Sequence, residues 1–156
     1  MEGRSPNFPH YWIFQFNPKK YNWFGWIKQK RLSEQWLVSR FDNIISEGDK
    51  VAIWASGKES GIYAIGKTIT HPFRKPLNPE QAKYYRPEAK NVIDKFKEKS
   101  SISITYLKVF VEKPISKYTC KNDAVLSSLE ILGNFTEATN FRIEKIQWTK
   151  ILEMAQ

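Results

Sequence analysis

A β-hairpin pattern in the middle of the chain limits the possible folds more than any other feature of the sequence. The turn signal Gly48-Asp49 precedes Lys50–Ala55, whose apolar side chains alternate between two faces. A short polar loop then leads to Gly61–Thr70, a second strand-like segment. Gly66 inside that segment predicts a bulge or a close backbone approach, which is how a small sheet curves into a barrel.

The remaining sequence alternates between strand-like and helix-like segments. Strand composition predicts strands at His10–Phe16, Ser101–Val111 and Phe141–Ile143. Helical spacing of apolar residues predicts a short helix or a tight turn at Tyr21–Lys30 and one or two helical turns at Phe41–Glu47. It predicts further helices at Glu80–Lys99, Asn122–Leu132 and Glu144–Met154. Strands separated by short helices, without regular βαβ units, predict an α+β fold. We expect a small mixed β-barrel of about five to six strands surrounded by short helices.

The net charge of +9 is concentrated in two stretches that flank the hairpin. Residues 17–40 and residues 66–99 each carry an excess of five positive charges, whereas residues 41–65 carry a net charge of −2. This distribution favours a polyanionic partner, and therefore nucleic acid, around a site near the hairpin. A lysine-rich solvated surface is the alternative interpretation of the same charges.

Length and cysteine content favour a single intracellular domain. The polar, proline-containing residues 1–8 are expected to form a flexible N-terminal arm, and residues 9–156 to form one domain. With Cys120 as the only cysteine, a disulfide framework or a Cys/His zinc site within the chain is excluded. No apolar run approaches the ~20 residues of a membrane span. We therefore expect a cytoplasmic protein that does not enter membranes.

The sequence contains no recognisable catalytic motif. The two histidines, His10 and His71, have no acid–base setting in the sequence. A nucleophile elbow, a phosphate-binding loop and a dinucleotide fingerprint are all absent. Three carboxylates, Asp42, Glu47 and Asp49, lie close together, but a helix end and the Gly-Asp turn explain their spacing. We expect a binding module with no catalytic residue, no metal and no cofactor.

Trp36 is the most informative of the six tryptophans. It follows a basic segment, and no apolar run of strand or helix period precedes it, which predicts a loop position. A loop tryptophan among cations is typically a contact for a ring or a base. The alternative is that Trp36 closes the end of the barrel. Trp54 lies on one face of the first hairpin strand, and either face is compatible with the barrel interior. The other four are assigned to the core by their strand or helix patterns: Trp12, Trp23, Trp26 and Trp148.

Several motifs, in order along the chain, resemble the EVE domain family. The resemblance extends from His10 to Ile151. Its parts are the strand Tyr11-Trp12-Ile13, the Gly48-Asp49 turn, the strand from Gly61 to Gly66, Thr139-Asn140-Phe141 and Gln147-Trp148. EVE domains have a PUA-like fold close to that of the YTH domains, which bind N6-methyladenine. The resemblance therefore implies recognition of a modified nucleobase, with no bond made or broken.

The resemblance to YTH domains also implies an aromatic cage of two tryptophans and one further apolar or aromatic side chain. Trp36 occupies the place of the first cage tryptophan. The second lies after the strand that corresponds to Gly61–Thr70, where this chain has no tryptophan. Three aromatic residues follow that strand instead, and Trp54 is a further candidate: Phe73, Tyr84 and Tyr85.

Two sets of residues are predicted to form the site. The base-binding set comprises the candidate cage walls and nearby polar side chains: Trp36, Trp54, Phe73, Asn17, Ser39 and Ser56. The phosphate-binding set comprises cations of the flanking loops: Lys19, Lys20, Arg40, Lys58, Arg74 and Lys75. The Asn17 amide follows the first predicted strand, where it can read a ring nitrogen or an exocyclic amine. Phosphate contacts add salt-dependent affinity without sequence information.

These predictions favour a reader of methylated DNA that flips the modified base into an aromatic pocket. N6-methyladenine is the favoured base, and methylated or hydroxymethylated cytosine is the second. The resemblance to readers in modification-dependent restriction systems suggests a targeting domain, fused to or assembled with a nuclease or NTPase subunit. Three alternatives stay open: a reader of modified RNA, an enzyme that modifies nucleic acid, and a domain that binds a small ligand or a protein.

Overall fold

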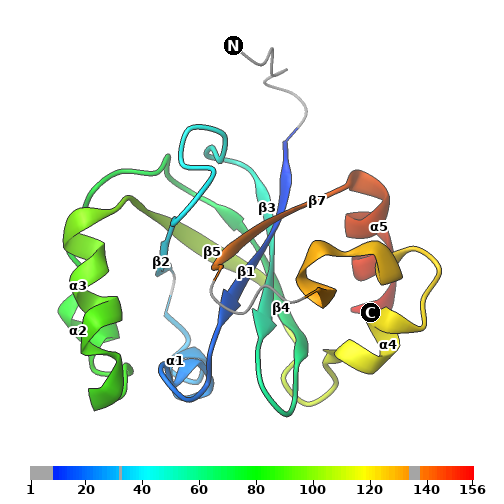
Figure 1. Cartoon of the computed structure of the whole chain (residues 1–156), viewed down its shortest axis with the longest axis horizontal. Coiled ribbons are helices and arrows are strands. Elements are labelled where there is room, and N and C mark those ends of the chain that lie inside the picture. Colours follow the sequence, from blue (N-terminus) through cyan, green and yellow to red (C-terminus); the bar gives the residue numbers. More distant parts are fainter. Residues whose placement is uncertain (1–8, 32, 134–137) are drawn as a thin grey trace.

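A curled, mixed sheet of seven strands forms the centre of the protein (Figure 1). The computed structural model describes residues 9–31, 33–133 and 138–156, so the expected arm at residues 1–8 lies outside the described residues. The strands are β1 (Tyr11–Phe16), β2 (Glu34–Leu37), β3 (Lys50–Ala55), β4 (Gly61–Thr68), β5 (Ser101–Val109), β6 (Ile115–Ser116) and β7 (Asn140–Ile143). Their order is β2-β5-β4-β3-β1-β7, with β6 paired to β4. Only the β1–β3 pairing is parallel among the pairs of the described strands.

Short helices surround this sheet. They are α1 (Trp23–Ile27), α2 (Pro79–Ala82), α3 (Lys90–Glu98), α4 (Lys117–Lys121) and α5 (Lys145–Met154). Three 3₁₀ turns complete the elements: η1 (Pro87–Ala89), η2 (Leu126–Ser128) and η3 (Glu130–Leu132). Helices α2 and α3 lie beside β2, whereas α4 and α5 lie at the opposite side of the sheet (Figure 1). The predicted α+β class, with a mixed barrel and short helices, is confirmed.

Two segments contain less helix than their apolar spacing predicts. Phe41–Glu47 forms a hydrogen-bonded turn only, in which the amide of Ile45 donates to the carbonyl of Phe41. Phe41 has a φ of 66°, a left-handed conformation that does not continue into a right-handed helix. Asn122–Leu132 contains η2 and η3, while the α-helix of this region, α4, ends at Lys121.

The hairpin is confirmed, together with the role of its glycine. β3 and β4 pair antiparallel, and the register between β4 and β5 shifts at Ile65/Gly66. A Cβ atom on Gly66 would lie 2.5 Å from the carbonyl oxygen of Thr105. Because no side chain fits at that distance, Gly66 allows β5 to approach β4 closely where the sheet bends.

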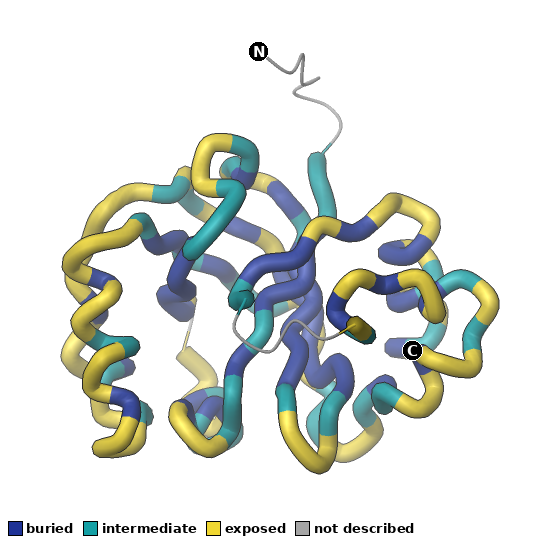
Figure 2. Tube along the Cα trace, in the orientation of Figure 1, coloured by how far each residue is buried: buried dark blue, intermediate teal, exposed yellow. Residues whose placement is uncertain are grey.

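Both faces of the central strands are buried (Figure 2). One face forms a core that includes Trp12, Phe14, Trp36 and Ile53. The other face forms a second core that includes Ile13, Ala52 and Trp54 of the sheet and Cys120, Trp148 and Ile151 of α4 and α5. The core positions predicted for Trp12, Trp23, Trp26 and Trp148 are confirmed. Alternation along β3 therefore separates two cores, with Trp54 on the side of α4 and α5 and Ile53 on the side of Trp36.

The two edge strands of the sheet, β2 and β7, are joined by a side chain. Asn140 on β7 is fully buried. Its Oδ1 accepts a hydrogen bond from the amide of Ser39 (2.9 Å), and its Nδ2 donates to the carbonyl of Leu37 (3.3 Å). The Nε of Arg40 donates to the backbone carbonyl of Asn140 (2.8 Å). Asn140 thus closes the barrel where no strand pairing does.

We expect Asn140→Ala to lower the free energy of unfolding by about 2 kcal/mol, because it leaves a buried amide and a buried carbonyl without partners. Chemical denaturation measures the change. Asn91→Ala, at an exposed position of α3, is the matched control and should change stability by less than ~0.5 kcal/mol. Equal effects of the two substitutions would show that Asn140 does not close the barrel.

Candidate functional site

A cavity of about 250 Å³ opens where β1 ends. Its lining comes from the end of β1 and the loop that follows, β2, the β3–β4 loop, Tyr85, α3 and the segment before β7. We call it the first cavity, and the residues used below are Gln15, Asn17, Lys20, Tyr21, Trp36, Ser56, Tyr85 and Lys95. Segments far apart in sequence therefore meet at this site. Of the predicted residues, it brings together Asn17, Trp36, Ser56 and Lys20.

Aromatic rings form one part of the first cavity. Trp36 packs near Phe14, with ring centroids 6.0 Å apart, and is only 5% exposed. Tyr21 and Tyr85 stack with centroids 4.3 Å apart and planes inclined by 25°. Tyr85 follows Gly61–Thr70, the segment after which the resemblance to YTH domains places the second residue of the aromatic cage. The cavity therefore presents an indole and a stacked tyrosine pair to a ligand.

The loop position predicted for Trp36 is wrong. Trp36 belongs to β2 and pairs with Ile102 on β5. The strand is only four residues long, and two of them, Glu34 and Gln35, are polar, so it lacks the alternation by which a strand is recognised. Glu34 and Gln35 are nevertheless buried, and hydrogen bonds satisfy both. Trp36 is thus a barrel-core residue that also lines the cavity.

Three polar side chains line the first cavity near the end of β1. The Asn17 Oδ1 accepts from the amide of Lys19 (2.9 Å), and its Nδ2 has no partner among the described residues. The Gln15 Nε2 donates to the carbonyl of Ala138 (2.7 Å), and its Oε1 has no partner among them. Ser56 adds a hydroxyl, while its amide is held by the carbonyl of Phe16 (2.9 Å). The cavity thus offers one amide donor, one amide acceptor and a hydroxyl.

Sequence reasoning missed Gln15. The signal for it was the single polar side chain in the strand Tyr11–Phe16, which is otherwise entirely aromatic or aliphatic. A polar residue in such a strand needs a partner, and the structure supplies it in the segment before β7.

A buried carboxylate lies behind the aromatic wall. Glu34 on β2 is 2% exposed and accepts hydrogen bonds from the hydroxyls of Tyr21 and Tyr106 and from the Nε1 of Trp23 (3.2 Å). The Nε1 of Trp36 in turn donates to the Tyr106 hydroxyl (3.4 Å). Burial raises the pKa of Glu34 to about 7, although the hydrogen bonds it accepts act in the opposite direction. This network holds Tyr21 and Trp36, two residues of the first cavity.

A second cavity, of about 640 Å³, adjoins the first. The two share Gln15, Asn17 and Ser56 as a common wall. The second cavity is lined by aromatic side chains and by lysines from three loops or helix ends: Phe24, Trp54, Tyr63, Lys19, Lys58 and Lys117. Trp54, Lys19 and Lys58, all predicted site residues, therefore lie here rather than in the first cavity. Lys95 on α3 and Lys117 at the start of α4 are cations that sequence reasoning did not select.

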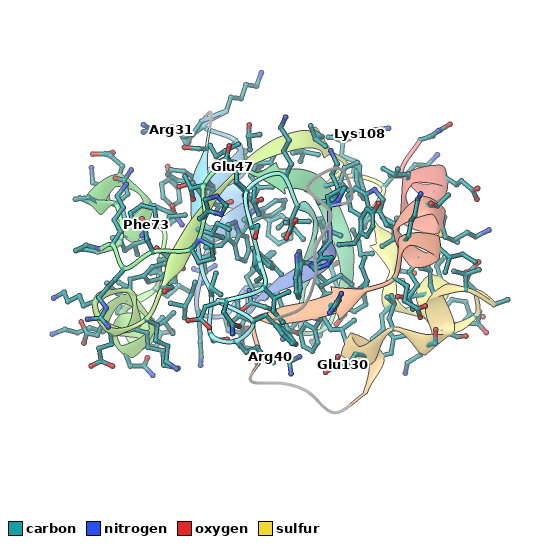
Figure 3. The ribbon with its side chains drawn as sticks, turned by 90° about the horizontal axis from the view of Figure 1, so that it is seen from above. Arg31, Arg40, Glu47, Phe73, Lys108 and Glu130 are labelled. Atoms are coloured by element: carbon teal, nitrogen blue, oxygen red, sulfur yellow. The ribbon has the colours of Figure 1, made fainter. Side chains whose placement is uncertain are left out.

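The other predicted residues lie outside both cavities. Phe73, 46% exposed, forms a β-bridge with Ser101, and Arg74 and Lys75 continue the same exposed loop. Figure 3 shows Phe73 on the side of α2 and α3, away from Arg40. The loop is tied to β2, since the Gln35 Nε2 donates to the carbonyl of Lys75 (3.0 Å), but its side chains line neither cavity.

Ser39 and Arg40 lie at the barrel closure. The amide of Ser39 bonds to Asn140, as described above. The Arg40 Nη2 forms an ion pair with the Oε1 of Glu130 (3.0 Å), and its guanidinium lies over the ring of Phe141 (5.1 Å). Arg40 and Glu130 lie close together in Figure 3. The structure thus gives both residues contacts that stabilise the fold.

The three clustered carboxylates do not form a metal centre. Asp49 is buried and accepts hydrogen bonds from the Trp12 Nε1 (2.8 Å) and the amides of His10 (3.1 Å) and Ser46 (3.0 Å). Within the described part of the chain, no three His, Cys, Asp or Glu side chains are grouped so that they could hold a metal ion. Among the same residues, no helix is long and apolar enough to cross a membrane.

Comparison with known proteins identifies relatives of this fold. The family model described as the EVE domain matches residues 10–154. A search of curated proteins gave no match. Among solved structures, a protein from Pseudomonas syringae has a TM-score of 0.68 and 21% identity, covering 94% of this chain and 99% of that one.

Two similar structures contain nucleic acid. Human THYN1, in complex with DNA containing 5-methylcytosine, has a TM-score of 0.62 and 12% identity, covering 94% of this chain and 98% of that one. The YTH domain of MRB1 from Zygosaccharomyces rouxii, in complex with N6-methyladenosine RNA, has a TM-score of 0.54 and 10% identity, covering 98% and 90%. At these identities the likeness shows a common fold, and the expected PUA-like architecture is confirmed.

Proposed function

Because the chain belongs to the EVE domain family, we propose that it is a modified-nucleobase reader that takes a methylated base of DNA, flipped out of the duplex, into the first cavity. The observation that carries the proposal is the composition of that cavity. It joins an indole and a stacked tyrosine pair to an amide donor and an amide acceptor that have no partner among the described residues.

Size and charge both support a single base as the ligand. The volume of about 250 Å³ lies just below the ~300–1,000 Å³ typical of sites for drug-sized ligands, as suits one ring system. Flipping a base costs a few kcal/mol, and stacking on aromatic side chains returns roughly 1–3 kcal/mol. Lys20 and Lys95 border the cavity, where they would bind phosphates of the flipped strand without reading sequence.

The polar wall fits the edge of an amino-substituted base. The Oε1 of Gln15 would accept from an exocyclic N–H, and the Nδ2 of Asn17 would donate to a ring nitrogen. N6-methyladenine, which keeps one N–H beside N1, satisfies both, and its methyl group would lie against the indole of Trp36. We therefore propose N6-methyladenine in DNA as the first ligand.

Methylated or hydroxymethylated cytosine is the second candidate. Cytosine also carries an exocyclic amine next to a ring nitrogen, N3, so the same polar side chains could bond to either base. The specific observation in its favour is that the similar human structure contains 5-methylcytosine DNA. RNA is a third candidate, because the similar YTH domain is bound to N6-methyladenosine RNA.

A binding panel tests the proposal. The duplexes of the set differ only by N6-methyladenine, 5-methylcytosine or 5-hydroxymethylcytosine. We expect one of them to bind about five- to thirtyfold more tightly than its unmodified parent, because a methyl pressed on a ring is worth about 1–2 kcal/mol. Asn17→Ala should weaken binding of the modified duplex and its unmodified parent alike, because both bases carry the ring nitrogen that Asn17 would bind. Asn43→Ala, at an exposed turn position, should leave binding unchanged. Fluorescence anisotropy measures both.

The same panel contains its own controls. Placing the modified base opposite an abasic site should raise affinity, because the cost of unpairing is already met. An RNA of the same sequence separates the DNA reader from the RNA reader. Recovery of intact, unaltered oligonucleotide with divalent metal present separates a reader from an enzyme. Equal affinity for all duplexes, or turnover of any of them, would overturn the proposal.

We further propose that this reader targets a modification-dependent restriction endonuclease, fused to or assembled with a nuclease or NTPase subunit. The chain's binding chemistry supplies a modified-base preference, and cleavage would be the work of that partner. Cleavage of the panel duplexes by the full assembly should then follow the preference that this chain shows alone. Cleavage that ignores the modification would contradict this role.

A further inference from the structure

We infer that the second cavity holds the nucleotide adjacent to the flipped base, with its base against Phe24 and Tyr63 and its phosphates at Lys58 and Lys117. The inference rests on the proposed function of the first cavity and adds a site to it. Three features of the second cavity carry it: its common wall with the first, its aromatic lining and its lysines, which form no ion pair with a described residue.

The common wall sets the spacing between the two ligands. Gln15, Asn17 and Ser56 line both cavities, so a single layer of side chains separates them. These residues come from the end of β1, the loop after it and the β3–β4 loop. A strand that continues from the flipped base across this wall would therefore reach the second cavity.

Aromatic side chains line the second cavity. Phe24 on α1 is half-buried and meets Tyr63 on β4 edge to face, with ring centroids 5.2 Å apart and planes inclined by 80°. The Tyr63 ring is held in place, since its hydroxyl donates to the carbonyl of Glu59 (2.6 Å). Stacking on such rings is largely independent of base identity, because every base has a π-face.

The charge of the second cavity fits a phosphodiester. Lys19, Lys58 and Lys117 line it, and none of these ammonium groups forms an ion pair with a described residue. Among the described residues that line it, Glu59 is the only one with a carboxylate. Positive charge therefore exceeds negative charge around an aromatic lining, which is the combination found in grooves that bind single-stranded nucleic acid.

Short DNA ligands test this site. The probes are N6-methyl-2′-deoxyadenosine and 5-methyl-2′-deoxycytidine, each alone and as a dinucleotide with thymidine on its 5′ or its 3′ side. We expect one of the two extensions to raise affinity about tenfold, within the range that stacking one base returns. Isothermal titration calorimetry measures the gain. The opposite extension should add little, because only one side of the first cavity adjoins the second.

Matched variants test whether the rise in affinity on extension to a dinucleotide arises in the second cavity. The Lys58→Ala/Lys117→Ala protein should lose most of the gain from extension and keep its affinity for the nucleoside. Lys67→Ala/Lys121→Ala removes the same charge from exposed positions outside both cavities and should keep the gain. Phe24→Leu, which retains apolar volume but removes the ring, should reduce the gain while the protein stays folded at the assay temperature.

The two proposals fail differently. If the modified nucleoside binds but neither extension raises affinity, or if the Lys58→Ala/Lys117→Ala protein keeps the full gain, the adjacent-nucleotide site is wrong and the base reader stands. If neither the nucleosides nor any modified duplex of the panel binds in preference to its unmodified counterpart, the proposed function itself is wrong.

Discussion

Replacing Trp36 with alanine is expected to lower the free energy of unfolding by about 3–5 kcal/mol, the usual cost of removing a buried large aromatic side chain, and to abolish preference for the modified base. Trp36 is 5% exposed and packs among Phe14, Phe16 and Tyr21 inside the barrel. It also lines the first cavity. One substitution therefore removes a core residue and a wall of the site, and chemical denaturation with anisotropy measures both losses.

A conservative pair of variants separates these two roles. Trp36→Phe keeps an aromatic ring in the core but shortens the wall and removes the indole donor to Tyr106. Trp148 on α5 has the same exposed fraction, 5%, and lines neither cavity. Trp148→Phe should therefore cost similar stability and leave base preference intact, whereas Trp36→Phe should weaken preference. Undiminished preference in a folded Trp36→Phe protein would make Trp36 a core residue only.

The second large effect is a pH dependence of stability that originates at Glu34. The pKa of this carboxyl is raised from 4.5 to about 7 in the folded protein, with burial as the main cause. Between these two pH values the folded protein holds a proton that the unfolded chain has released. The stability that Glu34 contributes is therefore complete below about pH 4.5 and is lost as the pH rises to about 7. The gap between the two pKa values corresponds to about 3 kcal/mol.

Glu34→Gln isolates this contribution, because glutamine has a similar shape and does not titrate. We expect the free energy of unfolding of the natural protein, minus that of the variant, to fall by about 3 kcal/mol between pH 4.5 and pH 8. Urea denaturation of both proteins across this range measures the difference, and the titrations of all other groups cancel. A difference that does not change with pH would mean that Glu34 keeps an ordinary pKa in the folded state.

Asn17 and Ser56 lie in the site where the sequence placed them. Each follows a predicted strand, so their place at a strand end was predictable, and both line the first cavity. Phe73 was selected as an aromatic residue after the return strand, and Arg74 and Lys75 as cations of the same loop. Their loop pairs with the start of β5 instead, through the bridge between Phe73 and Ser101, which is a contact that local composition does not encode.

The features that the sequence determined by itself are strands, bends and helices whose signals lie within short segments of the chain. Strand composition predicted β1, alternation predicted β3, and the hairpin pattern predicted β4. Gly66 predicted the bend, and apolar spacing predicted α5. Each of these signals depends on neighbours within one strand, hairpin or helix. The order of the motifs also sufficed to identify the EVE family, since a family pattern is a property of the chain as a linear sequence.

The tertiary structure alone decided the site. β2 has too few apolar residues to be recognised, and it exists because its backbone pairs with β5, far along the chain. That pairing buries Glu34 in a network with Tyr21, Tyr106 and Trp23 and places Trp36 beside Tyr85 at the first cavity. Asn140 then closes the barrel onto the residues after β2. These contacts join residues that are distant in sequence, and their free energy depends on packing and burial that exist only once the chain has folded.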